Sequence, residues 1–281
     1  MHIAISGATG FIGREVSRAL LRDGHRVTAA VRPGSAEAAK TVLGDAVTVV
    51  EIDLARPSAN LHMRLGQPDG FAHLAWGSLT DFNSHDHMAV ELPLHLAFLT
   101  ALVTSGLPRL TVVGTCLEYG LQSGALHEGL PANPVTPYGL AKDSLRRSLQ
   151  LLQRDVPYDL AWARLFYVYS EKAVRRTLMT QLTEAVARGD VSFAMSSGEQ
   201  LRDYLPADEQ AALIGRLIAA QGNSGVVNIC NGTPISVRRL VESWIAERGW
   251  NIALDPNKYP IPAYEPIAFW GDRSKLNHIL S

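Results

Sequence analysis

Two ionisable side chains stand four residues apart in the stretch PVTPYGLAK, residues 134–142: Tyr138 and Lys142. A helix is expected to begin after these prolines, and residues i and i+4 of a helix share a face. A lysine ammonium beside a phenol favours the phenolate and so lowers the pKa of the tyrosine. The pair is typical of a tyrosine that gives or takes a proton near neutral pH, once a cofactor is brought to it.

A third reactive group ends an apolar run in VVGTCLEYG, residues 112–120. Thr115 closes this expected strand, and its hydroxyl can donate to a substrate carbonyl oxygen. If the strand and the helix are neighbours, Thr115 lies beside the Tyr138 hydroxyl. Lys142 could then hold the ribose hydroxyls of a nicotinamide cofactor.

A glycine-rich turn, SGATGFIG, separates the first expected strand from the first expected helix. Gly7 permits a tight turn, Gly10 lets the backbone approach a pyrophosphate, and Gly13 lets the helix pack against the strand. The helix N-terminus offers N–H groups and a partial positive charge to the phosphates. In this strand–turn–helix context the pattern predicts a dinucleotide site.

The end of the second strand bears on which dinucleotide binds. It reads AAVRPGS, with Arg32 where NAD sites usually carry an acid for the ribose 2′-hydroxyl. A cation there can pair with a 2′-phosphate, so we predict NADP(H), with NAD(H) as the alternative, although Arg32 could also be a solvated loop residue. Asp53 is placed to accept from the adenine amino group or to cap the following turn.

These residues need a scaffold of alternating strands and helices. Apolar runs predict strands at 2–6, 26–31, 46–52, 70–76, 109–115 and 158–165, and apolar periodicity predicts helices at 11–22, 88–105 and 138–154. Such alternation implies a parallel sheet of right-handed βαβ units. We therefore expect an α/β fold with a Rossmann-type, doubly wound parallel sheet.

The pattern loosens after Phe166. Helices are expected at 176–188, 207–220 and 236–248, with a short strand at 226–230 and a proline-rich tail at 256–272. We predict an NAD(P)-binding domain over residues 1–165 with a return near 202–222. Residues 166–281 are then mainly a smaller α/β substrate-binding cap.

The amino-acid composition argues against several classes of binding partner and location. Charged residues are 19% of the chain and the net charge is -1, so no basic stripe predicts nucleic-acid binding. The N-terminus does not read as a signal peptide, and no apolar run approaches the ~20 residues of a membrane span. Two cysteines fit neither a disulfide framework nor a metal site. A cytoplasmic protein is expected.

Several motifs together carry a family resemblance that covers nearly the whole chain. They are GATGFIG (7–13), DL (53–54), HLAW (73–76), GTCLEYG (114–120), PVTPYGLAK (134–142), ARLFYVYS (163–170), RDYLPADE (202–209) and FWGDRSK (269–275). In this order and spacing the chain resembles an extended short-chain dehydrogenase/reductase, of the NAD-dependent epimerase/dehydratase family acting on nucleotide sugars.

The resemblance implies that Thr115, Tyr138 and Lys142 are catalytic. It implies a nucleotide-sugar substrate whose diphosphate is gripped by Arg202, a role that suits a bidentate guanidinium. Trp76, Thr115, Tyr167 and Arg202 form the expected substrate site. The expected cofactor site comprises Gly7, Thr9, Gly10, Phe11, Ile12, Gly13, Arg32, Asp53, Leu54, Leu74, Ala75, Trp76, Tyr138, Lys142 and Phe166.

Some positions depart from the family pattern. Tyr167 and Glu91 stand where members often carry Asn, which puts the usual phosphate contact at Tyr167 in question. Nucleotide-sugar 4,6-dehydratases follow their catalytic Thr with Asp-Glu, whereas this chain has Cys116 and Leu117. Glu118 comes one place later, where it is expected to turn to the other side. Dehydration is therefore disfavoured.

These observations predict an NADP-linked reductase of deoxysugar biosynthesis, acting on the 4-keto group of a nucleotide-activated 6-deoxyhexose with Tyr138 as proton donor. One alternative is a 4-epimerase that retains NAD tightly. Another is a non-catalytic NADP-binding regulator. The apolar helix at 88–105 and the helix at 138–154 are expected to join a homodimer.

One motif and three single residues could also take part in chemistry. For SHDH (84–87) we expect a solvated helix start with Asp86 near the cap rather than a metal site. His73 is expected to be packed, and Cys116 to be a small hydrophobe rather than a nucleophile. Trp76 could wall the sugar pocket or fill core.

Overall fold

A seven-stranded sheet forms the body of the protein in the computed structural model, which describes residues 1–171 and 177–281. All neighbouring strands in it run parallel. Their order is β12-β7-β5-β4-β1-β2-β3. Their bounds are β1 His2–Ser6, β2 Arg26–Val31, β3 Val47–Glu51, β4 Gly70–His73, β5 Arg109–Thr115, β7 Asp159–Leu165 and β12 Gly225–Ile229.

The strand order reverses between β1 and β4. From β1 the chain moves outward through β2 and β3, then returns to the other side of β1 and moves outward through β4 and β5. This reversal is the topological switch point of the sheet, and ligands of open α/β sheets bind outside the carboxyl ends of the strands at such a point. The predicted doubly wound sheet is confirmed, with β12 as an outer strand beside β7.

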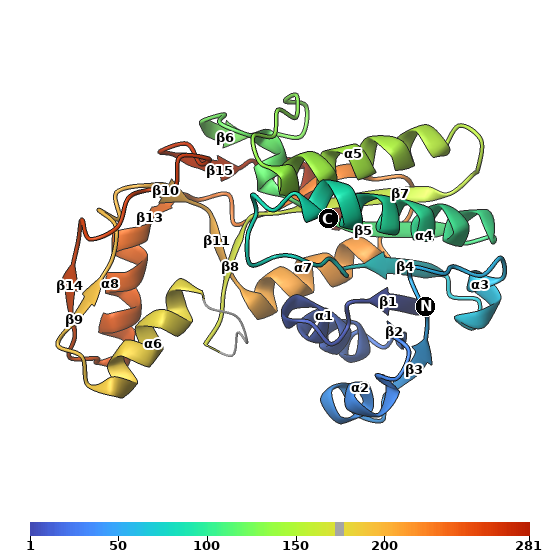
Figure 1. The fold of residues 1–281 in the computed structure, drawn as a ribbon, viewed down its shortest axis with the longest axis horizontal. Coiled ribbons are helices and arrows are strands. Elements are labelled where there is room, and N and C mark those ends of the chain that lie inside the picture. The colour runs from blue at the N-terminus through green and yellow to red at the C-terminus, as the bar shows by residue number, and fades with distance from the viewer. Residues whose placement is uncertain (172–176) are drawn as a thin grey trace.

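Helices cover both faces of the sheet (Figure 1). On one face α1 (Phe11–Arg22) packs against α7 (Ala207–Ala219), and α9 (Ser274–Leu280) lies beside α7 and β12. Residues such as Val16, Leu20 and Ile214 form the core there. The other face carries α3 (Leu61–Arg64), α4 (Leu92–Thr104) and α5 (Pro137–Leu152), while α2 (Ala36–Leu43) lies against β3.

The predicted helix at 88–105 has two parts, a π-helical turn η1 (His87–Glu91) and the α-helix α4. Pro93 near the start of α4 has no N–H, so a regular α-helical hydrogen-bond ladder cannot run through it. By length and composition, His87–Thr104 is the helical stretch among the described residues that could cross a membrane. Phe98, Leu99, Leu102 and Val103 bury one side of it in the core of the body.

The cap has its own small core (Figure 1, left). Helices α6 (Leu178–Arg188) and α8 (Val237–Arg248) pack around Leu182 and Trp244, next to the parallel pair β9 (Ser192–Ala194) and β14 (Ala253–Asp255). Short pairs connect cap and body: β8 (Tyr167–Tyr169) with β11 (Tyr204–Pro206), β10 (Leu201–Arg202) with β13 (Ile235–Ser236), and β6 (Gly124–Leu126) with β15 (Phe269–Gly271).

The later elements agree with the predicted ones to within a few residues. The first residue of the predicted helix 176–188 lies outside the described residues. The boundary between the two predicted domains stays a prediction. After Arg202 the chain contributes α7, β12 and α9 to the body, so these elements lie on the sheet although they follow the first cap residues.

Candidate active site

Helix α5 places Tyr138 and Lys142 on its buried face. It begins at Pro137, whose fixed φ suits the first helical position, and the Thr136 hydroxyl accepts from Gly139 N–H at 3.1 Å. Tyr138 and Lys142 are one turn apart, and the Lys142 ammonium lies 5.9 Å from the centre of the Tyr138 ring. The predicted pair is therefore brought together inside the protein.

Lys142 is almost completely buried, with 2% of its surface exposed. Its Nζ donates to the Val113 carbonyl at 2.9 Å and lies 3.9 Å from the centre of the Trp76 ring. Burial removes the ammonium from water and lowers its pKa to about 7, while the carboxylates of Glu118 and Glu91 act in the opposite direction. An ammonium has three N–H donors, so Lys142 keeps donors for a ligand besides Val113.

Thr115 ends β5 and caps the 3₁₀ turn η2 (Cys116–Tyr119). Its Oγ1 accepts from Leu117 N–H at 3.3 Å. Because the oxygen acts here as an acceptor, the hydroxyl keeps its own proton for donation. The adjacent strands β5 and β7 and the packing of α5 on η2 hold Thr115 at the carboxyl edge of the sheet, on the side where Tyr138 lies.

Glu118 turns into the core, as predicted. Its carboxylate accepts from Thr115 N–H at 2.8 Å, from Trp162 Nε1 at 2.9 Å and from Arg164 Nη2 at 2.8 Å. A Cβ at Gly114 would lie 2.1 Å from Trp162 Nε1 and 2.4 Å from this carboxylate, so a glycine is required there. Glu118 is thus fully used as a structural anion.

The glycine turn has the close contacts that a dinucleotide site requires. Gly7 has φ +75°, and a Cβ on it would lie 2.7 Å from Ala75 N. A Cβ on Gly13 would lie 2.0 Å from Gly7 O, which explains why helix and strand can pack so closely. Gly10 is the N-cap of α1 and has no side chain to cap it, so the first-turn N–H groups suit an anion.

The other predicted cofactor residues lie around this turn. Leu74, Ala75 and Trp76 follow β4, directly against Gly7, and Thr9, Phe11 and Ile12 belong to the turn and the start of α1. Arg32 follows β2 with an exposed side chain. Asp53 Oδ1 accepts from Ala55 N–H at 2.9 Å and so caps this turn, while its contact with adenine stays a prediction. Leu54 packs at the edge of the core under α4, and Phe166 is buried beside Tyr119 and Phe269.

Two residues that sequence reasoning missed lie against Tyr138. The Phe82 ring stacks on the phenol with centroids 5.1 Å apart, and Tyr138 N–H donates to the Phe82 carbonyl at 3.1 Å. The His87 ring lies 5.1 Å from the phenol and accepts from Trp76 Nε1 at 3.1 Å. Phe82 has no periodic neighbour in the sequence, and only the return of loop 77–86 onto α5 brings it there.

His87 therefore differs from the expected solvated helix start. His85 and Asp86 are exposed, whereas His87 is buried between Trp76 and the Asp81 carbonyl. Asp86 occupies the N-cap position of η1, but its side chain makes no capping hydrogen bond. No group of three His, Cys, Asp or Glu side chains placed to hold a metal occurs within residues 1–171 and 177–281.

A buried chain of hydrogen bonds runs beneath Trp76. Ser6 Oγ contacts His73 Nδ1 at 2.7 Å, His73 Nε2 contacts His95 Nδ1 at 2.9 Å, and His95 Nε2 contacts Glu91 Oε2 at 3.0 Å. Burial lowers the pKa of both histidines, that of His95 to about 4, so both rings are neutral at pH 7. Since the Glu91 carboxylate only accepts, His95 Nε2–H donates to it, His73 Nε2–H donates to His95 Nδ1, and the Ser6 hydroxyl donates to His73 Nδ1. His73 is packed, as predicted.

Arg202 is buried where the cap meets the body, with 1% of its side chain exposed. Its Nε and Nη2 donate to Glu265 Oε2 at 3.2 and 2.9 Å, and the guanidinium lies 4.6 Å from the centre of the Phe269 ring. Tyr167 donates its hydroxyl to the other oxygen of Glu265. The predicted substrate residues Arg202 and Tyr167 thus meet at a carboxylate that sequence reasoning missed.

Cys116 is buried among aromatic side chains of this region, and burial raises the pKa of its thiol. It behaves as the predicted small hydrophobe. Trp76 contacts Lys142, His95 and Tyr138 together, so its ring belongs to the catalytic surroundings and packs at the edge of the core as well.

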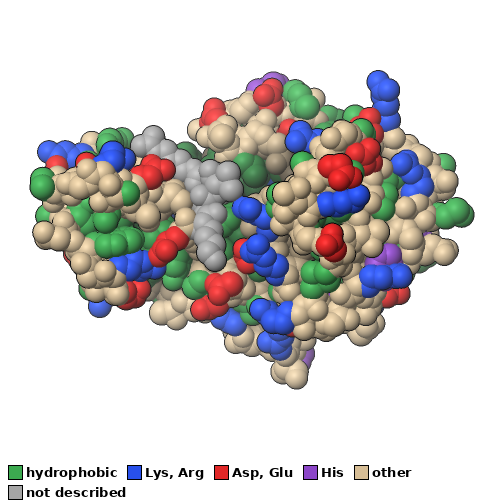
Figure 2. Space-filling model, turned by 90° about the horizontal axis from the view of Figure 1, so that it is seen from below, with side chains coloured by type: hydrophobic (Ala, Val, Ile, Leu, Met, Phe, Trp, Pro, Cys, Tyr) green, Lys and Arg blue, Asp and Glu red, His purple; other side chains and the backbone are tan. Residues whose placement is uncertain are grey.

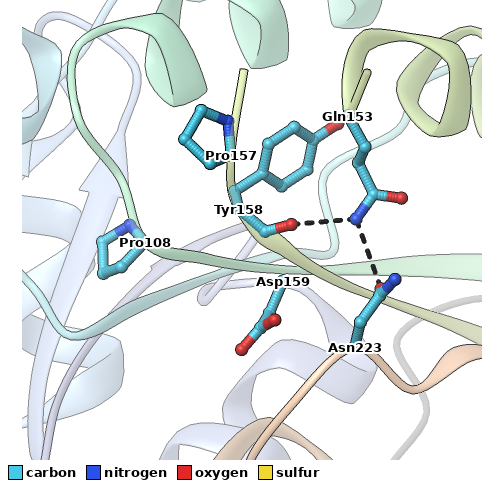
Figure 3. A pocket seen from close by; sticks show the side chains of 6 residues that line it. All are labelled: Pro108, Gln153, Pro157, Tyr158, Asp159 and Asn223. Carbon is cyan, nitrogen blue, oxygen red and sulfur yellow. Dashed lines mark hydrogen bonds between the residues drawn. The ribbon is translucent and has the colours of Figure 1, made fainter. Parts of the chain in front are cut away.

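A surface hollow lies at the opposite edge of the sheet (Figure 3). It is lined by Pro108, Gln153, Pro157, Tyr158, Asp159 and Asn223, and Gln153 Nε2 donates across it to Asn223 Oδ1 at 3.2 Å. These residues precede β5, β7 and β12 or follow α5, so they mark the amino ends of the strands. Ligands of open α/β sheets bind outside the carboxyl ends, where Thr115 and Tyr138 lie.

Charged side chains of both signs are interspersed over the face seen in Figure 2. Basic and acidic residues are nearly balanced over the whole chain, 26 against 27. The candidate site is therefore distinguished by its buried side chains and not by a surface patch of one charge sign.

Comparison with known proteins bears on this geometry. The sequence profile of the NAD dependent epimerase/dehydratase family matches residues 3–230. The dTDP-6-deoxy-L-talose 4-dehydrogenase (NAD(+)) of Aggregatibacter actinomycetemcomitans is 30% identical over 96% of this chain and 99% of its own length. The dTDP-6-deoxy-L-talose 4-dehydrogenase (NAD(P)(+)) of Kitasatospora kifunensis is 28% identical over 88% of this chain and 79% of its own.

A solved structure shares the whole architecture. The UDP-glucuronic acid 4-epimerase from Bacillus cereus, in complex with UDP-glucuronic acid and NAD, matches with a TM-score of 0.80. The match covers 100% of this chain and 93% of that chain at 21% sequence identity. At this identity the likeness establishes the fold.

Proposed function

The chain belongs to the NAD-dependent epimerase/dehydratase family, and from this premise we propose that it is an NADP-linked oxidoreductase acting on the 4-position of a nucleotide-activated 6-deoxyhexose. The net direction we propose is reduction of the 4-keto group. Two relatives whose names give a dTDP-6-deoxy-L-talose 4-dehydrogenase activity support this substrate class. The observation that carries the proposal is the burial of Tyr138 and Lys142 on one face of α5, a helix that packs against the turn η2 capped by Thr115.

Each catalytic side chain has a role that its contacts permit. When bound, NADP(H) supplies the hydride. Tyr138 gives its phenolic proton to the oxygen of the reduced carbonyl, and Thr115 donates a hydrogen bond to the same oxygen. Lys142 is fixed by Val113 and directs its remaining N–H donors to the ribose hydroxyls. Its positive charge also favours the phenolate that Tyr138 becomes after proton transfer.

The hydrogen bonds that hold the Glu118 carboxylate in the core argue against a dehydratase. Water elimination needs an acid and a base free to move protons beside the sugar. Glu118 is bound to Arg164 and Trp162 in the core, and Cys116 and Leu117 cannot replace it. This leaves hydride and proton transfer at one carbonyl as the chemistry that the residues support.

The test is turnover of purified protein with a panel of 4-keto nucleotide sugars and either NADPH or NADH. We expect loss of absorbance at the reduced nicotinamide band with at least one dTDP- or GDP-linked 4-keto-6-deoxyhexose. Oxidation of the matching 6-deoxytalose nucleotide with NADP⁺ tests the reverse direction. Absence of turnover across the panel in both directions would contradict the proposal.

A 4-epimerase is the second candidate, because the fold matches an enzyme of that name with NAD bound. Such an enzyme would retain its cofactor through purification and interconvert two nucleotide sugars without net change in NAD(P)H. Mass spectrometry of the purified protein and product analysis after incubation without added cofactor distinguish the two candidates.

The preference for NADP rests on Arg32, which is exposed beside the end of β1 and can meet a 2′-phosphate. The two talose 4-dehydrogenase relatives are named for NAD⁺ and for NAD(P)⁺, so the family allows either cofactor.

We also propose a homodimer formed by α4 and α5. Val90 in the turn η1, which leads into α4, and Leu140 and Leu151 in α5 expose between 44% and 54% of their surface. A second copy would cover this apolar face. Sedimentation at micromolar concentration should give a dimer, and a monomer would contradict the proposal. The cytoplasmic location stays a prediction.

A further inference from the structure

The phosphate-binding edge of Arg202 is already in use. A guanidinium binds two oxygens of a phosphate through a parallel pair of N–H groups. In Arg202 one such edge is formed by Nε and Nη2, and both donate to Glu265 Oε2. The remaining nitrogen, Nη1, donates to the Leu201 and Ile267 carbonyls at 2.8 and 3.3 Å. A diphosphate can therefore bind the parallel N–H pair of Nε and Nη2 only by displacing Glu265 from it.

Glu265 is bound through both oxygens of its carboxylate, but it does not lie on a helix or a strand. Its carboxylate, 12% exposed, is bonded by Arg202 on one oxygen and by Tyr167 on the other. It lies in the connection between β14 and β15, where Pro260, Pro262 and Pro266 have no N–H to donate. The backbone hydrogen bond from Glu265 N–H to Pro262 O spans 3.3 Å within this short turn. The turn can shift while the strands on both sides keep their pairing.

We infer that Glu265 is an internal counter-anion of Arg202 that the diphosphate of the substrate displaces, and that Glu265 thereby sets the affinity of the site for phosphate. This inference rests on the proposed function, which assigns the nucleotide diphosphate to Arg202. In the free protein the carboxylate compensates a buried guanidinium that would otherwise destabilise the cap. A diphosphate carries more negative charge and more acceptor oxygens than one carboxylate, so it can replace Glu265 on both Arg202 and Tyr167.

Substitution of a displaced counter-anion should affect binding in the opposite direction to substitution of a residue that contacts the ligand. Removing the charge of Glu265 weakens its hydrogen bonds with Arg202, so a nucleoside diphosphate should displace this side chain more easily and bind more tightly. If Glu265 instead contacted the substrate directly, its removal would weaken binding.

The experiment compares wild-type protein with Glu265→Gln by isothermal titration with dTDP and UDP, on the full chain saturated with NADP⁺. We expect the Kd of the nucleoside diphosphate to fall at least about tenfold in Glu265→Gln. The reason is that the ligand then no longer has to break the charged hydrogen bonds between Arg202 and the Glu265 carboxylate. Thymidine and uridine, which carry no phosphate, should bind both proteins equally. Glu171→Gln is the matched control, because Glu171 pairs with Arg248 at 2.5 Å on the surface of the cap.

A second variant tests whether the effect passes through the guanidinium. In Arg202→Met/Glu265→Gln the gain in affinity should disappear, and this protein is expected to fold because both buried charges are removed together. Equal or weaker binding of dTDP by Glu265→Gln, with wild-type binding intact, overturns the inference and leaves the proposed function standing. Failure of both proteins to bind either nucleoside diphosphate while binding NADP⁺ overturns both.

Discussion

Two buried arginine–glutamate pairs flank the catalytic residues, one in the body and one at the cap. Arg164 and Glu118 bond at 2.8 Å with exposed fractions of 2% and 0%, and Arg202 and Glu265 bond at 2.9 Å with 1% and 12%. The chemistry of the two pairs is the same, but their surroundings differ. Glu118 is fixed by strand and turn residues on three sides, whereas Glu265 lies in a proline-rich turn.

This difference teaches that a buried ion pair is not by itself a structural or a functional feature. A pair anchored on regular elements maintains the positions of its neighbours, here Thr115 and the end of β5. A pair with one partner on an irregular segment can exchange that partner for a ligand. If this is right, variants in the body should act on the chemical step and on stability, and variants at the cap should act on substrate binding.

The largest effect is expected at Tyr138. Tyr138→Phe removes the proton donor, so kcat should fall by about 10²–10⁴ while the Kd values of cofactor and nucleoside diphosphate stay within about twofold. Steady-state kinetics and titration of the same preparation measure both. If Tyr138→Phe kept nearly full kcat, another group would have to be the proton donor, and the catalytic role proposed for Tyr138 would be wrong.

Loss of the Glu118 charge should be the next largest. Glu118→Gln leaves the Arg164 guanidinium buried and uncompensated, and Arg164 Nη1 already has no hydrogen-bond partner among the described residues. The free energy of unfolding should therefore fall by about 3–5 kcal/mol. Urea unfolding followed by circular dichroism measures the change. Glu265→Gln should cost less than about 2 kcal/mol, because its turn can rearrange to hydrate Arg202. If Glu118→Gln and Glu265→Gln lowered the free energy of unfolding equally, the proposed difference between the two ion pairs would be wrong.

Lys142 gives the body a pH dependence. Burial lowers the pKa of Lys142 from 10.5 to about 7, so between these values the unfolded chain binds a proton that the folded protein does not. The free energy of unfolding of cofactor-free protein should therefore rise with pH across this window, by roughly 2 kcal/mol from about pH 7 to pH 9. Lys142→Met should lack this rise. Lys258→Met changes an exposed lysine and is the control, so its free energy of unfolding should rise with pH as in the wild type. If the wild type and Lys142→Met showed the same pH dependence of the free energy of unfolding, the lowered pKa of Lys142 would be contradicted.

The smallest effect is expected at the cofactor end. Arg32→Ala removes the proposed partner of the 2′-phosphate, so the ratio of kcat/KM for NADPH over NADH should fall roughly tenfold. Arg22→Ala, at the exposed end of α1, is the matched control and should leave the ratio unchanged. An unaltered ratio in Arg32→Ala would return Arg32 to the role of a solvated loop residue.

Much of the body could be predicted from the sequence because its signals are local. The strand at 109–115 and the helix at 11–22 were predicted with the bounds that the structure has, since each is an apolar pattern with a clear stop. The spacing of Tyr138 and Lys142 fixes their common helical face wherever the helix lies. Glu118 was expected to turn away from the site because it comes one residue later than the dehydratase pattern, and in the structure its capping hydrogen bond with Thr115 N–H at the start of η2 orients it.

Phe82, His87 and Glu265 could not be predicted, because each reaches the site through a loop whose path no periodicity records. Their positions depend on contacts between segments far apart in the chain: Phe82 with Tyr138, and Glu265 with Arg202 and Tyr167. The expected solvated helix start at 84–87 was wrong for His87 for the same reason, since the Trp76 indole and the Asp81 carbonyl bury it.

The amino-acid sequence by itself determined the parallel sheet, the glycine turn and the chemical identity of the tyrosine, lysine and threonine. These follow from side-chain size, periodicity and backbone freedom, which act over a few residues. Only the tertiary structure decided which charges neutralise each other, which aromatic ring covers the phenol and which carboxylate holds the buried arginine. Electrostatic and packing energies depend on distance in space and on exclusion of water, and both are set when distant segments meet.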